Sequence, residues 1–472
     1  MNNISIFDVI ILIAYLVVIL WIGVRSCKKV SDDRDFFTAK RSFGPLILIA
    51  TVCATTLGGS SMMGRAGLGY TNGIECLMTA LPYTIGMFIF SGYSGRIFDV
   101  GIRHNISSIP ELFGYRFGKT SKIVIAIMVA FAMIGTVASQ VTATATIFKL
   151  LGTNIGISYE VGAVLATVVF IIYTSASGLF GVVYTDVIQF LVLAIFVYIT
   201  IPFSSISSIG GLGAFLSNID TSYLIPHVDG RIAADIISYL VITMAGAEMW
   251  QRAFAAKNRK AAKKGMFFGT IVYTLCVSMV FVMSLAAQQL IPNVLETYGS
   301  TDAVIPALAT TYLPVGLTGL ALAGILSVMM STADSYLLVS VQTVASDIGK
   351  TLKPDMSGKT VLCFSRIATV ILALGALIIA LYIKSAYNIL TMIYNFYAAA
   401  AGIPALAALY WKKATAAGMV CANIGGFAMC AAWKIVGNPF GLGGTLPGAL
   451  VCAALLVTVS LATYKKHPCR MA

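Results

Sequence analysis

Two short stretches of the sequence place polar side chains inside apolar segments that are long enough to cross a membrane. The first, Ala54–Gly69, reads ATTLGGSSMMGRAGLG and holds a glycine pair, hydroxyl side chains and Arg65. The second, Gly324–Ser340, reads GILSVMMSTADSYLLVS, and helical spacing puts Ser331 and Asp334 on one face. Hydroxyl and carboxylate oxygens are ligands for hard cations, and an unwound segment that faces a cavity adds backbone carbonyls. Together the stretches predict a cation site.

Each of these features also has a purely structural explanation. Gly64 and its neighbours could allow two helices to pack closely, and serines in membrane helices often bond back to their own carbonyls. We assign that second role to Ser327. Ser331, Thr332 and Asp334 together favour a site, because an ionised carboxylate buried in a bilayer is costly unless something pairs with it.

Two further charged residues lie in apolar segments. Asp186, in YTDVIQF, could bind a cation or could cap the amino end of its helix, where the macrodipole favours an anion. Arg65 lies about two turns after the glycine pair, towards the outside, where its guanidinium could receive a solute carboxylate. Arg65 could instead pair with Glu75 or extend to the outer interface.

The elements that must position these groups are membrane helices. The 472 residues are 58% hydrophobic and 10% charged, and the mean hydropathy of +0.91 lies outside the range of soluble proteins. Apolar runs of about 20 residues recur along the chain and predict about thirteen spans. These spans begin near Ile6, Gly44, Gly73, Ser121, Tyr159, Thr185, Ala233, Lys264, Pro314, Val361, Ala386, Ala414 and Gly444.

The distribution of positive charge predicts the orientation of the chain. Lys and Arg collect in alternate loops, such as QRAFAAKNRKAAKKG and KTLKPDMSGK, which the positive-inside rule assigns to the cytoplasm. We therefore expect a multi-pass protein of the plasma membrane, or bacterial inner membrane, with its amino terminus outside and its carboxyl terminus in the cytoplasm. The net charge of +13 is explained by topology and predicts no nucleic-acid partner.

The sequence does not suggest an enzyme or a metal–sulfur protein. The nine cysteines form no CxxC pair, and no nucleophile–base arrangement or metal-ligand cluster is visible in any span. No loop exceeds about thirty residues, which is too short for a separate soluble domain. We expect a single transmembrane domain over residues 1–472 and no obligatory protein partner.

A second interruption, ITMAGAEMWQR at Ile242–Arg252, lies five spans after the first. Many secondary transporters consist of two inverted repeats whose first helices are broken at corresponding positions. We therefore predict a first five-helix repeat over about 44–205 and a second over about 232–410. Peripheral helices are expected at about 5–24, 414–436 and 443–464.

Four motifs in order resemble the sodium:solute symporter family: IPELFGYRFG, YTSASGLFGVVYTDVIQF, QRAFAAKNRKAAKKG and MMSTADSYLL. That family includes proline, pantothenate, sialic acid and sugar symporters. The resemblance runs from the first span to near the end of the thirteenth. It implies an all-α polytopic membrane protein with the LeuT-type fold of two inverted five-helix repeats, here with one extra helix before them and two after.

The resemblance also implies a main sodium site, with Na⁺ as the coupling ion. Backbone carbonyls would come from the first broken helix, at Ala54 and Leu57, and from Val328. Side-chain hydroxyls would come from Ser331 and Thr332.

A possible second cation site, present in some members of the family, would use Asp186, Asp334 and Ser335. This chain has an acid at Asp334 where a serine stands in some two-sodium transporters. A second sodium, a proton on Asp334 or a structural pairing all remain open.

The implied fold places the solute at the midplane, next to the broken helices. Besides Arg65, the substrate-binding candidates are Thr55, Thr56, Ser60, Ser61, Gln140, Glu248, Tyr394, Asn395 and Tyr397. The two tyrosines could equally be core residues. Sialic acid symporters carry their carboxylate-binding arginine on the fourth span, where this chain has none, so that substrate is not supported.

We expect a sodium-coupled symporter that imports a small polar, carboxylate-bearing solute by alternating access. An amino acid, a monocarboxylate or a sugar acid would fit, and the partners are this solute, sodium ions and the lipid bilayer. Two alternatives stay open. One is a proton-coupled symporter that uses Asp186 or Asp334 on the same fold, and the other is a solute-binding membrane sensor without net transport.

Overall fold

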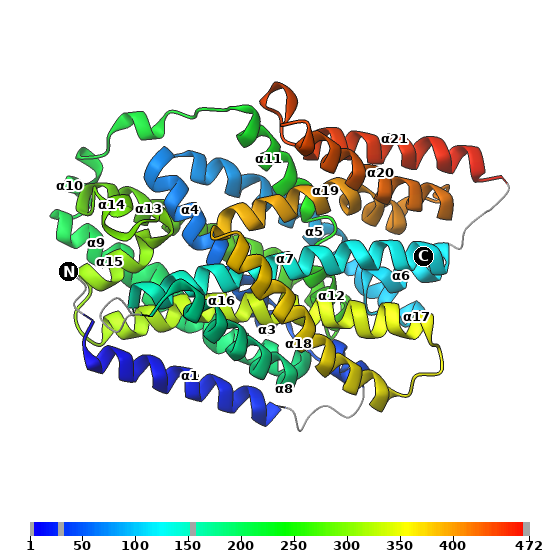
Figure 1. The fold of residues 1–472 in the computed structure, drawn as a ribbon, viewed down its shortest axis with the longest axis horizontal. Coiled ribbons are helices and arrows are strands. Elements are labelled where there is room, and N and C mark those ends of the chain that lie inside the picture. The colour runs from blue at the N-terminus through cyan, green and yellow to red at the C-terminus, as the bar shows by residue number, and fades with distance from the viewer. Residues whose placement is uncertain (1–3, 27–32, 152–156, 466–472) are drawn as a thin grey trace.

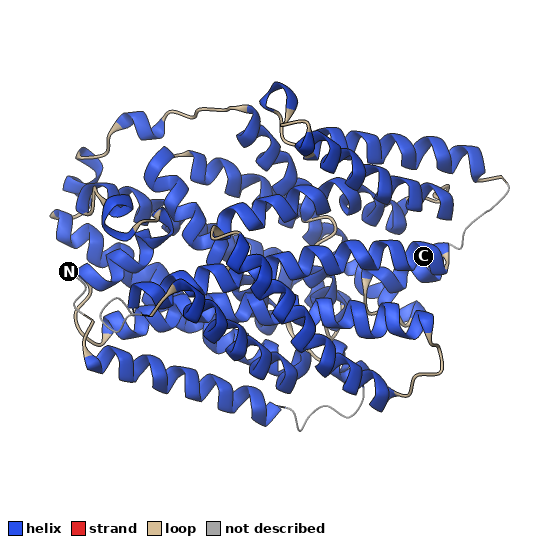
Figure 2. Cartoon of the chain, in the orientation of Figure 1, coloured by secondary structure: helices blue, strands red, loops and turns tan. Residues whose placement is uncertain are grey.

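The computed structural model describes residues 4–26, 33–151 and 157–465, and these residues form helices and connecting loops without a β-strand (Figure 2). Eleven described helices are long and apolar enough to cross a membrane. One bent pair of helices passes the same test together, and the apolar segment Tyr159–Ser175 is shorter. The all-α polytopic fold is confirmed, and these elements account for the predicted spans.

The helices follow one another with short connections, and α1 and α21 lie at opposite edges of the bundle (Figure 1). Their bounds are α1 (Ile6–Ser26), α2 (Asp33–Thr38), α3 (Pro45–Thr56), α4 (Gly59–Asn72), α5 (Glu75–His104), α6 (Ile109–Phe117), α7 (Lys119–Leu151), α8 (Tyr159–Leu193), α9 (Thr200–Ile209), α10 (Leu212–Ser217), α11 (Gly230–Ile242), α12 (Ala247–Ala255), α13 (Arg259–Leu290), α14 (Val294–Tyr298), α15 (Val304–Tyr312), α16 (Leu317–Val341), α17 (Lys350–Leu352), α18 (Gly358–Tyr382), α19 (Ala386–Tyr410), α20 (Ala416–Ile435) and α21 (Thr445–Thr463).

The first predicted break is confirmed. The chain enters α3 with a proline at its first position, which suits a helix start, and leaves the helix at Thr56. The segments Pro45–Thr56 and Ser61–Asn72 are bent by 57° relative to each other. Gly59 permits a close approach to α16, because a Cβ added there would lie 2.2 Å from Cγ of Met329.

The second predicted break is also confirmed, because residues 243–246 separate α11 from α12. Side chains satisfy the carbonyls that this break releases. The Tyr397 hydroxyl donates to the carbonyl of Ala245 (2.8 Å), and Trp250 Nε1 donates to that of Met244 (3.1 Å). Such compensation is required at membrane depth, where water does not hydrate exposed backbone groups.

Helix α16 is the central element of the bundle. Every residue in its most apolar window is buried, and it packs against α3, α4, α7, α8 and α12. In Figure 1 it lies between the edge helix α1 and the pair α20 and α21. A helix without a lipid-facing side can carry polar residues wherever a neighbouring helix supplies hydrogen-bond partners. The predicted cation site lies on this helix.

Helix α8 contains a kink that changes one predicted boundary. Gly178 has φ 53° and ψ −172°, a conformation that side-chain-bearing residues rarely adopt. The sixth span therefore begins at Gly178 and continues through a π-helical turn (Ala194–Ile199) into α9, whereas the sequence predicted a start near Thr185. Asp186 consequently lies inside this helix, two turns beyond the kink, so the capping explanation for it is wrong.

Gly178→Ala should lower the free energy of unfolding by about 1–3 kcal/mol, because a side chain disfavours this backbone conformation. The added Cβ would also lie 2.7 Å from Cδ2 of Phe36. Thermal unfolding in detergent measures the change. Gly375→Ala in α18 is the control, since nothing lies within 4 Å of its added Cβ and alanine favours a helix. Equal melting temperatures for the two variants would contradict this role of Gly178.

Candidate functional site

Backbone and hydroxyl oxygens from α3 and α16 gather at the first break. The Ser331 hydroxyl donates to the carbonyl of Ala54 (2.9 Å) and lies 3.2 Å from that of Val328. The Thr332 hydroxyl lies 3.1 Å from the carbonyl of Thr55 and 3.4 Å from that of Ala54. All of these residues are buried. A compact group of oxygens without nitrogen or sulfur fits a hard cation such as sodium.

The fifth predicted ligand, Leu57, lies at the end of α3. Its amide donates to the carbonyl of Cys53 (3.0 Å), and Gly58 and Gly59 follow. Gln140 of α7 lies against both glycines, because a Cβ added at either would lie about 3.5 Å from its amide group. The break is therefore enclosed between α7 and α16.

A buried arginine, Arg252 of α12, forms a second polar cluster next to this one. Its guanidinium forms an ion pair with Asp186 of α8 (3.4 Å) and donates to the hydroxyls of Ser335 (2.7 Å), Thr51 (3.1 Å) and Thr55. Thr51 in turn donates to Asp186 (2.5 Å). This cluster joins α3, α8, α12 and α16, and it shares Thr55 with the oxygen cluster.

The three residues predicted for a second cation site do not all share a single hydrogen-bonding partner. Arg252 binds both Asp186 and Ser335, whereas Asp334 accepts a hydrogen bond from Thr174 of α8 (2.9 Å). The second carboxylate oxygen of Asp334 has no hydrogen-bond partner among the described residues. A sodium ion placed between Asp186 and Ser335 would lie beside a guanidinium of the same charge, which opposes its binding.

Sequence reasoning did not single out Arg252, although a signal was present. The residue directly precedes the basic loop that continues as AFAAKNRKAAKKG, so it was counted among the cytoplasmic cations. Its position four residues after Glu248 puts both side chains on one face of α12, inside the interrupted span. The Arg252 guanidinium also donates to the backbone carbonyl of Glu248 (3.1 Å).

Arg65 of α4 is buried among aromatic residues. Its guanidinium donates to the hydroxyls of Ser61 (2.6 Å) and Tyr273 (2.9 Å) and lies 5.1 Å from the ring centre of Tyr239. Nε of Arg65 has no hydrogen-bond partner in the described part of the chain. Hydroxyl groups and a cation–π contact stabilise this charge only partly.

The alternative pairing of Arg65 with Glu75 is not observed. Glu75 instead accepts a hydrogen bond from the side chain of Asn72 (2.8 Å) at the carboxyl end of α4. Within the described residues, no carboxylate lies at ion-pairing distance from Arg65. Arg65 is therefore a buried cation with a free Nε donor and without a carboxylate partner in the part of the chain that the structure describes.

Glu248, Tyr394 and Tyr397 lie together around a small enclosed cavity at the second break. Glu248 is buried in the first turn of α12, and its Oε2 has no hydrogen-bond partner among the described residues. Tyr83 of α5 and Tyr336 of α16 complete the aromatic part of the lining. The structure thus groups three of the predicted substrate residues at the second break.

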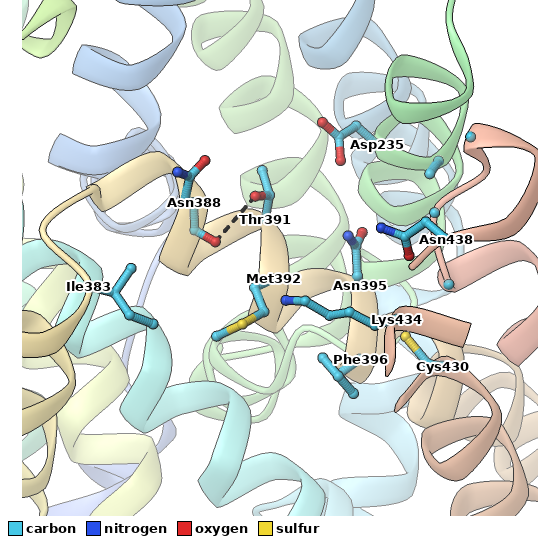
Figure 3. A pocket seen from close by; sticks show the side chains of 14 residues that line it. Asp235, Ile383, Asn388, Thr391, Met392, Asn395, Phe396, Cys430, Lys434 and Asn438 are labelled. Atoms are coloured by element: carbon cyan, nitrogen blue, oxygen red, sulfur yellow. Dashed lines mark hydrogen bonds between the residues drawn. The ribbon is translucent and has the colours of Figure 1, made fainter. Parts of the chain in front are cut away.

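The remaining candidates lie elsewhere. Asn395 lines a pocket of about 440 Å³ between α11, α19 and α20, where Figure 3 shows it near Asn438 and Lys434. Its amide oxygen accepts hydrogen bonds from Thr445 (2.9 Å) and Ser238, so it faces α21 and not the first break. The structure does not bring Asn395 to the other candidates.

Two hydroxyl-bearing residues at the first break, Thr56 and Ser60, were also predicted to bind the substrate. Thr56 bonds back to the carbonyl of Val52 (2.7 Å), as threonines in helices commonly do. The side chain of Ser60 lies outside the described residues. Ser61 contacts the buried Arg65, and Thr55 contacts the buried Arg252.

Comparison with known proteins identifies the family. The model of the sodium:solute symporter family matches residues 36–426, which is most of the chain. The chain belongs to the sodium:solute symporter family. Sodium is therefore the coupling ion of this symporter, which is a multi-pass membrane protein.

Individual relatives of this symporter span most of its length. The sodium/pantothenate symporter of Haemophilus influenzae is 30% identical over 416 residues, covering 83% of this chain and 82% of that protein. The osmoregulated proline transporter OpuE of Bacillus subtilis is 24% identical over 97% of this chain and 94% of its own. The structure of a Na⁺-coupled sialic acid symporter in its substrate-bound outward-open state has a TM-score of 0.82 at 19% identity and covers 99% of both chains. This similarity confirms the expected fold.

Asp186→Asn should lower the free energy of unfolding by about 3–5 kcal/mol, because it leaves buried Arg252 without its counter-charge. Adding Arg252→Gln should restore part of the loss. Thermal unfolding in detergent without sodium measures both variants. The control is Glu160→Gln, which breaks an exposed ion pair with Lys384 (2.6 Å) and should not change the melting temperature. Equal melting temperatures for Asp186→Asn and this control would contradict a structural ion pair at Arg252.

Proposed function

We propose that this symporter imports a small carboxylate-bearing solute together with sodium by alternating access. The observation that carries the proposal is Arg65, a buried guanidinium with a free Nε donor and no counter-charge among the described residues. A planar guanidinium binds a carboxylate through two parallel hydrogen bonds, and a charged solute would neutralise it on binding. Ser61 and Tyr273 hold the side chain in place for this contact.

The main sodium ligands in this proposal are the carbonyls of Ala54, Leu57 and Val328 and the hydroxyls of Ser331 and Thr332. The distances of 2.9–3.4 Å between the oxygens of α3 and α16 support it. A sodium ion bound here would accept lone pairs from both the hydroxyls and the carbonyls and would hold α3 against α16.

Coupling in this proposal follows from the positions of the two sites on one broken helix. The carbonyl ligands of Ala54 and Leu57 lie in and directly after α3, and Arg65 lies beyond the break on α4. Sodium that fixes α3 against α16 also restricts α4 and therefore the position of Arg65. Binding can drive transport only if the outward- and inward-facing states have unequal affinities. A membrane potential adds about 2.3 kcal/mol per charge per 100 mV to inward movement.

The proposed topology follows the distribution of basic loops. The first repeat covers about residues 44–205 and the second about 232–410, with opposite orientations in the membrane. The amino terminus lies outside and the carboxyl terminus in the cytoplasm of the cell whose plasma membrane, or bacterial inner membrane, holds the symporter. Solute and sodium would enter at the end of α4 near Asn72 and leave at the opposite end of the bundle.

The proposal is tested by thermal stabilisation and by transport. The detergent-purified protein is screened against amino acids, sugar acids and monocarboxylates, each in sodium chloride and in choline chloride. A stabilising compound is then radiolabelled and offered to proteoliposomes with an inward sodium gradient. Sodium-dependent accumulation supports the proposal, whereas tight binding without accumulation would instead indicate a sensor.

Thr332→Ala should raise the sodium concentration for half-maximal stabilisation or uptake by about tenfold, because it removes one charge–dipole contact of about 1.4 kcal/mol or more. Ser340→Ala is the matched control on the same helix, since its hydroxyl bonds back to the carbonyl of Leu337 (2.8 Å) away from the break. A sodium titration of the melting temperature distinguishes the variants. If both titrate like the unchanged protein, Thr332 is not a sodium ligand.

Arg65→Lys should weaken solute affinity about tenfold or more and leave the sodium titration nearly unchanged, because lysine keeps the charge but lacks the two-pronged donor geometry. Solute titrations at saturating sodium measure the first effect, and sodium titrations without solute measure the second. Unchanged solute affinity in Arg65→Lys would remove Arg65 from the solute site and with it the main support for a carboxylate.

A further inference from the structure

We infer that the solute is a zwitterion whose carboxylate binds Arg65 and whose ammonium group binds Glu248. This inference rests on the proposed carboxylate function and adds a second, opposite charge to the solute. It depends on three features of the described residues: an unpaired acid, a cavity of matching size, and a layer of tyrosine rings that joins the acid to Arg65.

The first feature is the incomplete charge compensation of Glu248, which Arg252 attracts while forming its own ion pair with Asp186. Its side chain is 3% exposed, and Oε2 has no hydrogen-bond partner among the described residues. Arg252, one turn later on α12, donates to the backbone carbonyl of Glu248 and forms its ion pair with Asp186. The amino end of α12 favours the ionised carboxylate through the helix dipole. A buried charge of this kind requires an opposite charge, which the solute can supply.

The second feature is the cavity that Glu248 lines. It is enclosed, with room for a group about the size of one water molecule. The hydroxyl-bearing rings of Tyr83, Tyr336, Tyr394 and Tyr397 form much of its wall. An ammonium group matches this environment, because it is compact, carries three donors and is attracted by aromatic faces.

The third feature connects the cavity to Arg65. The ring of Tyr83 lies 5.4 Å from that of Tyr273 and 6.4 Å from that of Tyr239, and both of these rings contact Arg65. Tyr83 also lines the cavity of Glu248. One layer of tyrosine rings therefore separates the cation from the acid, so a small solute lying along this layer presents one charged end to each.

The test compares matched compounds that share a carboxylate and a carbon skeleton and differ in the amine. The pairs are L-alanine with propionate, L-proline with cyclopentanecarboxylate, and γ-aminobutyrate with butyrate. Affinities come from thermal stabilisation of the detergent-purified protein in sodium chloride. We expect at least one amino acid to bind about tenfold or more tightly than its partner. Because this comparison uses the unchanged protein, it does not depend on how well a variant folds.

Glu248→Gln should then reduce the preference within that pair to about threefold or less while the acid alone binds as before. Glu75→Gln is the matched control, because Glu75 is a buried acid of α5 that already accepts a hydrogen bond from Asn72, and it should keep the full preference.

Three outcomes would overturn the inference. Equal affinities within every pair would contradict a zwitterionic solute. A preference for the amino acid that persists in Glu248→Gln would contradict the role of Glu248. Either result would leave the proposed carboxylate function unaffected. Failure of all six compounds to stabilise the protein in sodium would overturn the zwitterion and the carboxylate together.

Discussion

The interruption between α3 and α4 is the constraint on which the rest of the structure depends. A helix that stops within a bilayer releases backbone carbonyls that water does not reach, so neighbouring groups must satisfy them. The hydroxyls of Ser331 and Thr332 on α16 reach the carbonyls of Ala54 and Thr55. This explains why the most buried helix of the bundle carries so many polar residues. The partners that stabilise the break are also the oxygens that suit a sodium ion.

Some buried charges are neutralised by another residue of the protein, whereas others have no ion-pair partner among the described residues. Arg252 and Asp186 neutralise each other and hold four helices together. Arg65, Glu248 and Asp334 form no ion pair among the described residues, although all three are buried. Because an isolated charge at membrane depth is unfavourable, we propose that a charged solute supplies partners to Arg65 and Glu248.

Local sequence patterns predicted the two breaks and most of the spans, and the family resemblance implied the residues of the main oxygen cluster. Each of these depends on residues close together in the chain, or on a motif confined to one helix. The sequence did not reveal the role of Arg252, because its partners Asp186 and Ser335 lie on two other helices. The kink at Gly178 was missed for a related reason, since one glycine in an apolar run changes the backbone without changing hydropathy. Asn395 faces α21 because of helix rotation, which a motif does not determine.

The most direct test of the central claim follows hydrogen–deuterium exchange of the purified symporter in sodium chloride and in choline chloride. Sodium bound between the break and α16 should slow exchange in peptides that cover residues 54–62 and 328–335. Peptides from α20 and α21 should exchange equally in both salts. Identical exchange around the break in the two salts would contradict a sodium ion bound there.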